Sequence, residues 1–372
     1  MTLSLQPALD SLVSHRASDL HLSVGVPPVL RIAGDLHVQD GEVLAPEAID
    51  ALLAEALTEW QRDRLAADHT LDLGLTSDAG ERYRINVYRE RGHYALAIRW
   101  LEGTSHTLEE LRLPGQIAEL ARIRDGLVLM TGATGSGKST TLASLINIIN
   151  ESRRCHILTI EDPIEFLHEN KRALVHQREV GADVGSFGGA VRSALREDPD
   201  VVLVGEMRDT ETISAALTVA ETGHLVFSTL HTNDAIGVLD RIIGVFPGHA
   251  QMAIRQQLSM SLRAVVTQTL VKTRDGKGRV PINEILMVNH AVAHLIREHR
   301  PEQIRSIMET GRQDGNQTLE QAIAVRIRQG LIDRAAGLAM TTRPEQLEDL
   351  LRLGDGDGAS GPGASQRDRR RR

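Results

Sequence analysis

The chain of 372 residues contains a single cysteine, Cys155, and few aromatic residues. One cysteine excludes an internal disulfide framework and a cysteine-rich zinc site, and it fits a protein of the reducing cytoplasm. Aromatic residues make up only 2% of the chain. The core must therefore be built mainly from aliphatic side chains and alanine.

Long apolar runs are also missing. No stretch approaches the roughly 20 residues that a helix needs to span a bilayer. The residues after Met1 lack the basic start and the apolar run of a signal peptide, so we expect none. If the protein works at a membrane, we expect it to act from one side.

The charge balance is acidic, with 42 Lys and Arg against 50 Asp and Glu and a net charge of −8. This argues against a general nucleic-acid binder, because such proteins need a basic surface. Hydrophobic residues at 41% and charged residues at 25% are typical of a globular protein. The length suggests about two to three domains.

A glycine-rich loop in the middle of the chain matches the phosphate-binding pattern G-x-x-x-x-G-K-[ST]. This P-loop consists of Gly132, Ala133, Thr134, Gly135, Ser136, Gly137, Lys138, Ser139 and Thr140. Glycines let backbone N–H groups approach and surround phosphate oxygens. The pattern predicts that Lys138 reaches the β- and γ-phosphates and that Ser139 offers its hydroxyl to Mg²⁺.

The segments around the P-loop fit a parallel sheet with crossover helices. Residues 127–130 form an apolar run typical of a buried strand, and residues 140–150 continue with helical spacing. Further strands are predicted at 156–160, 201–204 and 225–230, with helices between them. The sequence therefore predicts an α/β fold around the P-loop.

Acidic and histidine residues follow these later strands. Glu161 and Glu165 follow the first, Glu206 the second and His231 the third. Ligands of parallel sheets bind at the carboxyl ends of the strands. An apolar strand that ends in an acid is typical of a Walker B motif, so Glu206 is predicted to bind Mg²⁺ or position water. His231 is either a structural histidine or a γ-phosphate sensor, and its position favours the sensor.

The first part of the chain is predicted to form a separate α+β domain. Its expected elements are a helix at 5–13, strands at 19–24 and 29–32, one amphipathic helix over 46–65, and hairpin strands at 82–89 and 93–100. The hairpin carries Arg82, Arg84, Arg89, Arg91 and Arg99. They form either a solvated face or a set of which some reach a nucleotide on a neighbouring subunit, because guanidinium matches phosphate geometry.

The remaining segments are predicted from their secondary structure and contain no candidate site residue. We expect a linker at 101–106, a helix broken by a proline over 108–123, mostly helix over 234–270, a hairpin-like element at 271–289 and four helices at 290–299, 301–310, 318–329 and 344–353. The tail, 354–372, ends in four arginines and is predicted to be disordered. It is either solvated or bound to an anionic partner such as lipid headgroups.

Four segments in a fixed order resemble the Walker A, Asp box, Walker B and His box of the type II/IV secretion ATPase superfamily. They are residues 132–140, 159–166, 196–209 and 222–233. Within this superfamily the chain resembles the type IV pilus retraction motors of the PilT type. The resemblance runs from about residue 15 to residue 340 and includes the segment Ala-Ser-Asp-Leu-His-Leu at 17–22.

The resemblance implies roles for the residues of these boxes. Lys138 and Ser139 would bind the phosphates of ATP and Mg²⁺, and Glu206 would support the metal. Glu165 would activate the attacking water, and Glu161 competes with it for this role of general base. A carboxylate at a strand end can orient water for in-line attack while Mg²⁺ and arginine neutralise the developing charge.

The resemblance also implies an assembly. His231 would sense the nucleotide, and Arg84 and Arg99 would act on the site of the neighbouring subunit in a homo-hexamer. The implied layout is a PAS-like N-terminal domain over 1–104, a RecA-like ATPase core over 105–290, a helical region over 291–353 and a disordered tail over 354–372.

Two features bear on the kind of motor. The family's C-terminal motif Ala-Ile-Arg-Asn-Leu-Ile-Arg-Glu is changed at residues 291–298, where Ala293 replaces the first arginine. The four-cysteine zinc element of pilus-extension and type II secretion members is absent, which favours retraction over assembly. An accessory retraction ATPase of the PilU type is the nearest alternative.

The function that the resemblance implies is ATP-driven pilus retraction and twitching motility. The expected partners are an inner-membrane pilus platform protein and a second retraction ATPase, and the expected location is the cytoplasm at the inner face of the cell membrane. A weakly hydrolysing, nucleotide-binding regulator is a second hypothesis. A DNA translocase, and nucleic-acid binding in general, is disfavoured by the charge and by the lack of an aromatic or basic platform for single strands.

Overall fold

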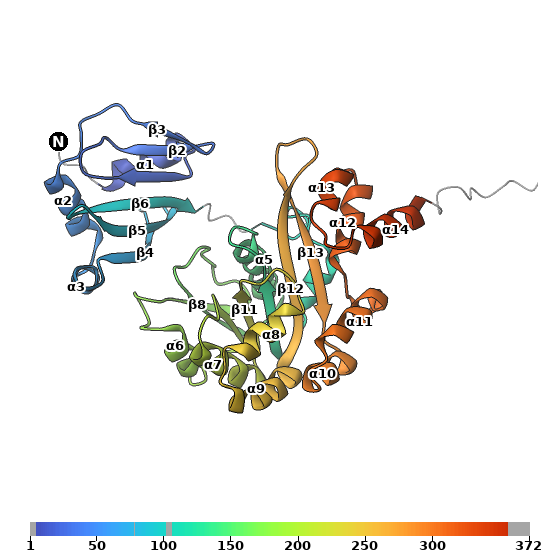
Figure 1. Cartoon of the computed structure of the whole chain (residues 1–372). Helices are drawn as coiled ribbons and strands as arrows, with labels where there is room; N and C mark the ends of the chain where they lie inside the picture. Colours follow the sequence, from blue (N-terminus) through green and yellow to red (C-terminus); the bar gives the residue numbers. More distant parts are fainter. Residues whose placement is uncertain (1–4, 78, 102–105, 356–372) are drawn as a thin grey trace, which may run out of the picture.

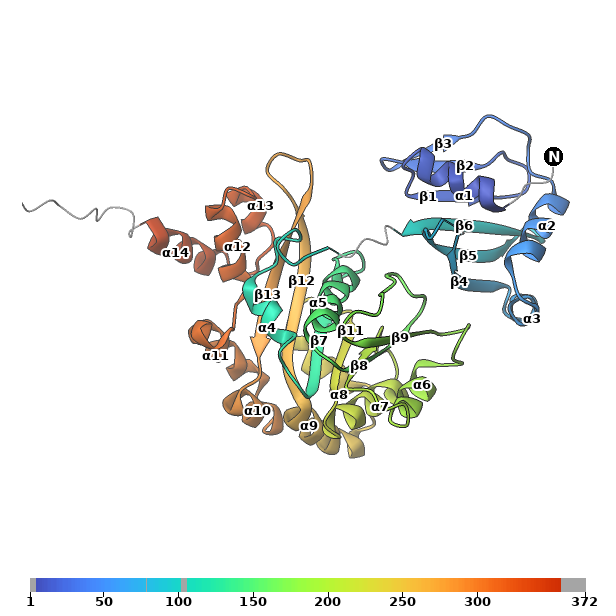
Figure 2. The same ribbon diagram turned by 180° about the vertical axis from the view of Figure 1, so that it is seen from behind.

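A computed structural model describes residues 5–77, 79–101 and 106–355. Two views show an N-terminal α+β domain at one end, a central α/β domain, and a group of helices at the other end (Figures 1 and 2). Most of the predicted linker, at 102–105, and residues 356–372 of the predicted tail lie outside the described residues. Among the described residues, no helix has the length and apolar character needed to cross a membrane.

The N-terminal domain is an antiparallel sheet covered by helices. Its sheet has the order β3-β2-β1-β6-β5-β4. The elements are α1 (Leu5–Ser14), β1 (Asp19–Leu22), β2 (Val29–Ile32), β3 (Asp35–Val38), α2 (Pro46–Ala56), α3 (Glu59–Asp68), β4 (Thr70–Thr76), β5 (Arg82–Glu90) and β6 (His93–Leu101). On β5, Tyr83, Ile85 and Val87 are buried in the domain core. Because side chains alternate along a strand, Arg82 and Arg84 lie on the opposite face.

The central domain is built on a seven-stranded sheet with the order β13-β12-β7-β11-β10-β8-β9. The strands are β7 (Gly126–Thr131), β8 (His156–Glu161), β9 (Leu174–Glu179), β10 (Val201–Val204), β11 (Leu225–Leu230), β12 (Leu262–Lys272) and β13 (Arg279–Met287). All pairs are parallel except β12 with β13, which form a hairpin. The predicted parallel α/β core is confirmed.

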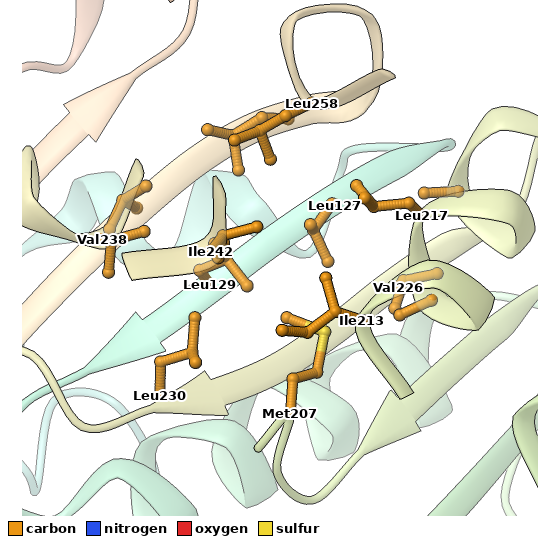
Figure 3. Close-up of a cluster of buried hydrophobic side chains, with 14 of the residues drawn as sticks. Leu127, Leu129, Met207, Ile213, Leu217, Val226, Leu230, Val238, Ile242 and Leu258 are labelled. Carbon is orange, nitrogen blue, oxygen red and sulfur yellow. The ribbon is translucent and has the colours of Figure 1, made fainter. Parts of the chain in front are cut away.

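Helices cover both faces of this sheet. They are α4 (Gly115–Leu120), α5 (Lys138–Ser152), α6 (Phe187–Ala194), α7 (Thr210–Glu221), α8 (Gly237–Gly244) and α9 (Gly248–Ser261). Leu127 and Leu129 of β7 pack with α6 to α9 on one face. Figure 3 shows these two side chains with Ile213 and Leu217 of α7, Val238 and Ile242 of α8, and Leu258 of α9. Val128 and Met130 pack with α4 and α5 on the other face. A strand buried on both faces is a continuous apolar run, which is how the sequence reads.

The first C-terminal helices pack against the central domain, and the last ones pack at the turn of the β12–β13 hairpin. They are α10 (His290–Arg297), the 3₁₀ turn η1 (Pro301–Gln303), α11 (Ile304–Thr310), η2 (Arg312–Asp314), α12 (Leu319–Arg328), α13 (Arg334–Leu338) and α14 (Pro344–Asp355). Val280 and Ile282 of β13 share an apolar cluster with α12 and α14. Helix α14 extends into the first two residues of the predicted tail.

Several sequence predictions of local structure were wrong. The helix expected over 46–65 is two helices, because Thr58 caps α3 in a capping box with Gln61. The helix expected over 108–123 is only α4, which begins after an extended Pro114. Strands β3, β4 and β9 and helix α13 were not predicted.

The largest error concerns residues 262–270, which were expected to be helical and instead form most of β12. The run from Val265 to Val271 is rich in valine and threonine, which favour a strand. The strand pairs with β13 along residues 264–272 and with β7 along residues 262–267, and residues 264–268 are buried. The strand and hairpin therefore belong to the central sheet rather than to a separate element.

Phe227 of β11 is fully buried in the cluster beneath α5, in a chain with few aromatic residues. We expect Phe227→Ala to lower the free energy of unfolding by about 3–5 kcal/mol, because it removes apolar contacts and leaves a cavity. Urea unfolding followed by circular dichroism measures the change. Met252→Ala, at a side chain that is 78% exposed, is the control and should change stability by less than about 0.5 kcal/mol. Equal small effects of both variants would contradict the central position of Phe227.

Candidate nucleotide site

The P-loop connects β7 to α5 at the carboxyl edge of the parallel strands. Gly132, Gly135 and Gly137 have positive φ angles of 135°, 76° and 85°, which side chains other than glycine rarely adopt. A Cβ atom at Gly132 would collide with the carbonyl oxygen of Gln268. The glycines are thus needed both for the turn and for the close approach of β12.

Lys138 is the first residue of α5 and is buried beneath the loop. Its Nζ donates hydrogen bonds to the carbonyl oxygens of Gly132 at 2.8 Å and Ala133 at 3.0 Å. Burial lowers the pKa of Lys138, while the charges of Glu206 and Glu165 act in the opposite direction. The structure therefore brings together the lysine of the P-loop and both predicted carboxylates.

The loop offers a cradle that fits an anion. Helix α5 is 15 residues long and directs its N-terminus toward the loop, where the helix dipole and free N–H groups favour negative charge. The hydroxyl of Ser136 is buried without a hydrogen-bond partner among the described residues. Ala133, Thr134, Gly135 and Ser139 are exposed at the same place. A phosphate group would supply the missing acceptor, so the residues present fit a nucleotide.

A magnesium ion could be held only together with that nucleotide. The described residues contain no group of three or more His, Cys, Asp and Glu side chains that could hold a metal. The sequence predicts Ser139 and Glu206 as its protein ligands, and Mg²⁺ commonly binds through few protein ligands plus phosphate oxygens and water.

A buried polar network braces the P-loop from β12. The side-chain amide of Gln268 donates to the carbonyl oxygen of Ser136 at 2.8 Å, and its oxygen accepts from Thr141 at 3.0 Å and Asn283 at 2.9 Å. Thr131 and Thr267 are also hydrogen-bonded, at 2.8 Å. Sequence reasoning missed Gln268, because its segment was predicted to be helical. The polar residues inside an apolar β-branched run were the available signal.

Glu206 follows β10 and lies beside His231, which follows β11. His231 Nε2 is 3.1 Å from Glu206 Oε1, and Arg208 pairs with the same carboxylate at 2.5 Å. These residues line a cavity of about 430 Å³ that also includes Thr134 of the P-loop. The predicted Walker B acid and the predicted sensor histidine are therefore in direct contact, and both border the phosphate loop.

The Asp box presents two glutamates in different environments. Glu161, at the end of β8, accepts hydrogen bonds from Thr159 at 2.7 Å and Gln177 at 3.3 Å. Burial raises its pKa to about 7 despite these hydrogen bonds. Glu165 lies on the following loop, is partly exposed, and has no side-chain hydrogen-bond partner among the described residues.

The arginines of the N-terminal hairpin divide into two kinds. Arg84 and Arg99 are cross-strand neighbours on β5 and β6, and their side chains are 40% and 62% exposed. They pair with Asp72 at 3.4 Å and Asp19 at 2.8 Å, within their own domain. No hydrogen bond or ion pair joins either of them to the P-loop in the described part of the chain.

Arg82 differs from them, because it is buried against the central domain. It pairs with Glu179 of β9 at 2.5 Å and donates to the backbone of the Asp box. The sequence singled it out only as one of five arginines on the hairpin. Its position on an edge between domains gave no local signal that could separate it from the others.

Comparison with known proteins agrees with this geometry. A family model described as "Type II/IV secretion system protein" matches residues 3–336. The chain is 46% identical over 305 residues to a twitching motility protein of Neisseria gonorrhoeae, covering 82% of each chain. It is 43% identical over 329 residues to the type IV pilus retraction ATPase PilT of Pseudomonas aeruginosa, covering 88% of this chain and 95% of PilT.

Solved structures give the same result. The fold is similar to the crystal structure of the pilus retraction motor PilT with bound ADP, with a TM-score of 0.85, 41% identity, and coverage of 93% of this chain and 99% of that chain. The ATPase DotB of Legionella pneumophila gives a TM-score of 0.80 at 31% identity, with coverage of 90% and 94%. On this sequence and structural similarity, the chain belongs to the type II/IV secretion system protein family.

Proposed function

We propose that this protein is a Mg²⁺-dependent ATPase that powers type IV pilus retraction as a homo-hexamer. The observation that carries the proposal is the convergence of Lys138, Glu206, His231 and the Asp box at one edge of the sheet. The similarity to PilT over 95% of its length supports the retraction function. The ADP bound in the similar PilT structure supports a nucleotide ligand here.

The chain's own residues suggest how hydrolysis proceeds. Lys138 and the N–H groups of the P-loop would hold the phosphates, and Ser139 and Glu206 would hold Mg²⁺, which neutralises charge on the transferred phosphoryl group. His231 contacts Glu206, so it would respond to a nucleotide bound beside that carboxylate. Catalysis of this kind depends mainly on positioning and on electrostatic stabilisation.

Glu165 is the better candidate for the general base. Its carboxylate accepts no hydrogen bond within the described chain. It is near enough to Lys138 for its charge to raise the pKa of that lysine. Glu161 is occupied by Thr159 and Gln177 and is protonated in part at neutral pH. We assign Glu161 the role of supporting the loop that carries Glu165. The negative charge of Glu165 contributes to the raised pKa of Glu161.

The base and ribose of ATP have room on the other side of the P-loop. A cavity of about 1330 Å³ borders Gly137, Thr140 and Thr141 and extends beneath the β12–β13 hairpin. Its lining includes backbone and polar side chains of residues 110–113 and 272–279. The lysines and arginines of this lining, among them Lys272 and Lys277, would complement the negative charge of a nucleotide.

In the proposed hexamer, each nucleotide site would be completed by residues of a neighbouring subunit. Arg84 and Arg99 are exposed on one face of the N-terminal sheet and keep their guanidinium groups accessible. We propose that they contribute positive charge to a nucleotide held by the neighbouring subunit, as guanidinium matches phosphate geometry. The expected site of action is the cytoplasmic side of the inner membrane, with a pilus platform protein as partner and no nucleic acid.

The accessory alternative rests on two observations. The chain is 36% identical over 352 residues to the type IV pilus ATPase PilU of Pseudomonas aeruginosa, covering 95% of this chain and 92% of PilU. Ala293 of α10 stands where the PilT-type motif has arginine. The higher identity to PilT and the intact acids favour the primary motor over both an accessory ATPase and a weakly hydrolysing regulator.

Removal of the phosphate-binding lysine tests the enzyme assignment. We expect Lys138→Ala to abolish Mg²⁺-dependent phosphate release and Glu206→Ala to lower it by about 100-fold, because both remove charge stabilisation in the transition state. Release of inorganic phosphate from ATP is the measurement. Glu151→Gln, in a surface pair with Lys171, is the control. Absence of turnover by the wild-type hexamer with any divalent ion would refute the ATPase assignment.

The raised pKa of Glu161 predicts a pH effect on stability. Between pH 4.5 and about 7 the unfolded chain loses this proton while the folded chain keeps it, so stability falls as pH rises through this window. Glu161→Gln removes the effect. Its melting temperature relative to wild type should therefore be higher at pH 8 than at pH 5. For Glu151→Gln the difference from wild type should be the same at both values, since the pKa of Glu151 is lowered.

Cells that lack the protein test the direction of force. A retraction motor predicts excess surface pili and lost twitching, because pilin continues to assemble without being withdrawn. Electron microscopy and a twitching-zone assay measure both. Wild-type protein should restore motility and Lys138→Ala should not. Cells without pili would instead indicate an assembly motor.

A further inference from the structure

The backbone of Ile164 in the Asp box is held from two sides. Its N–H donates to Glu179 Oε2 at 3.1 Å, and its carbonyl oxygen accepts from Arg82 Nε at 3.0 Å. Glu179 lies at the end of β9 in the ATPase domain, whereas Arg82 begins β5 in the N-terminal domain. One backbone position is therefore fixed by both domains at once.

The two holding side chains also bind each other. Arg82 Nη2 is 2.5 Å from Glu179 Oε2, and the side chains are only 9% and 8% exposed. Arg82 donates further to Thr76 Oγ1 at 3.1 Å, and Glu179 Oε1 accepts the N–H of Gly74 at 3.0 Å. A Cβ at Gly74 would collide with both side chains. The packing and the hydrogen bonds leave these charges little freedom to move.

A buried ion pair is a weak source of stability, because desolvation offsets most of the attraction. The location of this pair suggests a different use. Ile164 is followed directly by Glu165, the proposed base, whose own side chain has no hydrogen-bond partner among the described residues. The position of that carboxylate is therefore set by the backbone that precedes it. A misplacement of about 1 Å can cost on the order of 100-fold in rate.

We propose that Arg82 and Glu179 are positioning residues for Glu165, so that the water-activating carboxylate is in place only while the N-terminal domain is docked on the ATPase domain of its own chain. This inference rests on the proposed function. It assigns two different roles to the arginines of one hairpin. Arg82 fixes the base in its own chain, and the exposed Arg84 and Arg99 remain available to a neighbouring subunit.

Two conservative variants of the full-length hexamer test the inference. Glu179→Gln keeps the size of the side chain and one carbonyl oxygen but removes the charge that holds Arg82. Arg82→Lys keeps a positive charge but cannot donate to both Glu179 and Ile164 from a planar fork. We expect each to lower kcat for ATP by about 10- to 100-fold with KM unchanged, because the P-loop and its contacts to the phosphates are intact.

A double-mutant comparison distinguishes positioning from a general structural effect. In a Glu165→Gln background the base is already lost, so neither variant should lower the residual kcat further. The affinity for a fluorescent ATP analogue should be equal in all of these proteins. Arg82→Lys combined with Glu179→Gln should be no slower than the slower single variant, since both act on the backbone of the same residue, Ile164.

Three results would overturn the inference. They are an unchanged kcat in both single variants, an equal further loss in the Glu165→Gln background, and a loss of nucleotide affinity that accounts for the slower rate. Asp125→Asn is the matched control, because Asp125 forms a 2.5 Å pair with Arg263 before β7, away from the Asp box. If one variant fails to assemble a hexamer, the other carries the test.

The same assay separates this inference from the proposed function. Absence of turnover in the wild-type protein rejects the ATPase assignment and the inference with it. Turnover in the wild type that depends on Lys138 but is unaffected by Glu179→Gln and Arg82→Lys rejects only the positioning role.

Discussion

A buried lysine at the start of α5 is the constraint on which this structure depends. Lys138 can remain charged at that depth only because two carbonyl oxygens accept from it and the carboxylates Glu206 and Glu165 lie near. Those carboxylates come from the ends of separate strands. The order of strands in the sheet, and the helices that bury both of its faces, therefore serve to bring these charges to one edge.

The P-loop also depends on a strand that follows it by more than a hundred residues. Gln268 of β12 binds the loop backbone and joins Thr141 and Asn283 in a buried network. A buried polar group that loses its partner destabilises the fold. Other arrangements of the loop would break these hydrogen bonds, so the network favours a single one. Helices α12 to α14 pack at the far end of the same hairpin. The nucleotide loop and the C-terminal region are thus connected through β12 and β13.

The N-terminal domain is tied to the chemistry by few contacts of high specificity. Its core is separate from that of the ATPase domain, and Arg82 and the N–H of Gly74 form polar contacts from this domain to Glu179 and Ile164. Interfaces between domains that rely on a small polar contact permit relative motion. A motor that changes domain orientation during its cycle can use such a contact to set when the base is in position.

The sequence predicted the parts of the site whose chemistry is local. The P-loop pattern specifies its glycines, Lys138 and Ser139, because the backbone geometry around a phosphate allows few alternatives. The apolar strands that precede Glu161, Glu206 and His231 were also predicted, because each fully buried strand is a short apolar run. These elements were confirmed within one or two residues at their ends.

The sequence could not determine what depends on contacts between distant segments. β12 was mistaken for helix because its strand state depends on its neighbours β7 and β13. The brace of Gln268 and the docking of Arg82 on Glu179 join residues that are far apart in the chain, so no local pattern indicates them. The sequence alone was thus sufficient to identify the chemical groups of the site. Only the tertiary structure decided which of them hold the P-loop and the Asp box in place, because burial and hydrogen-bond geometry exist only in the folded chain.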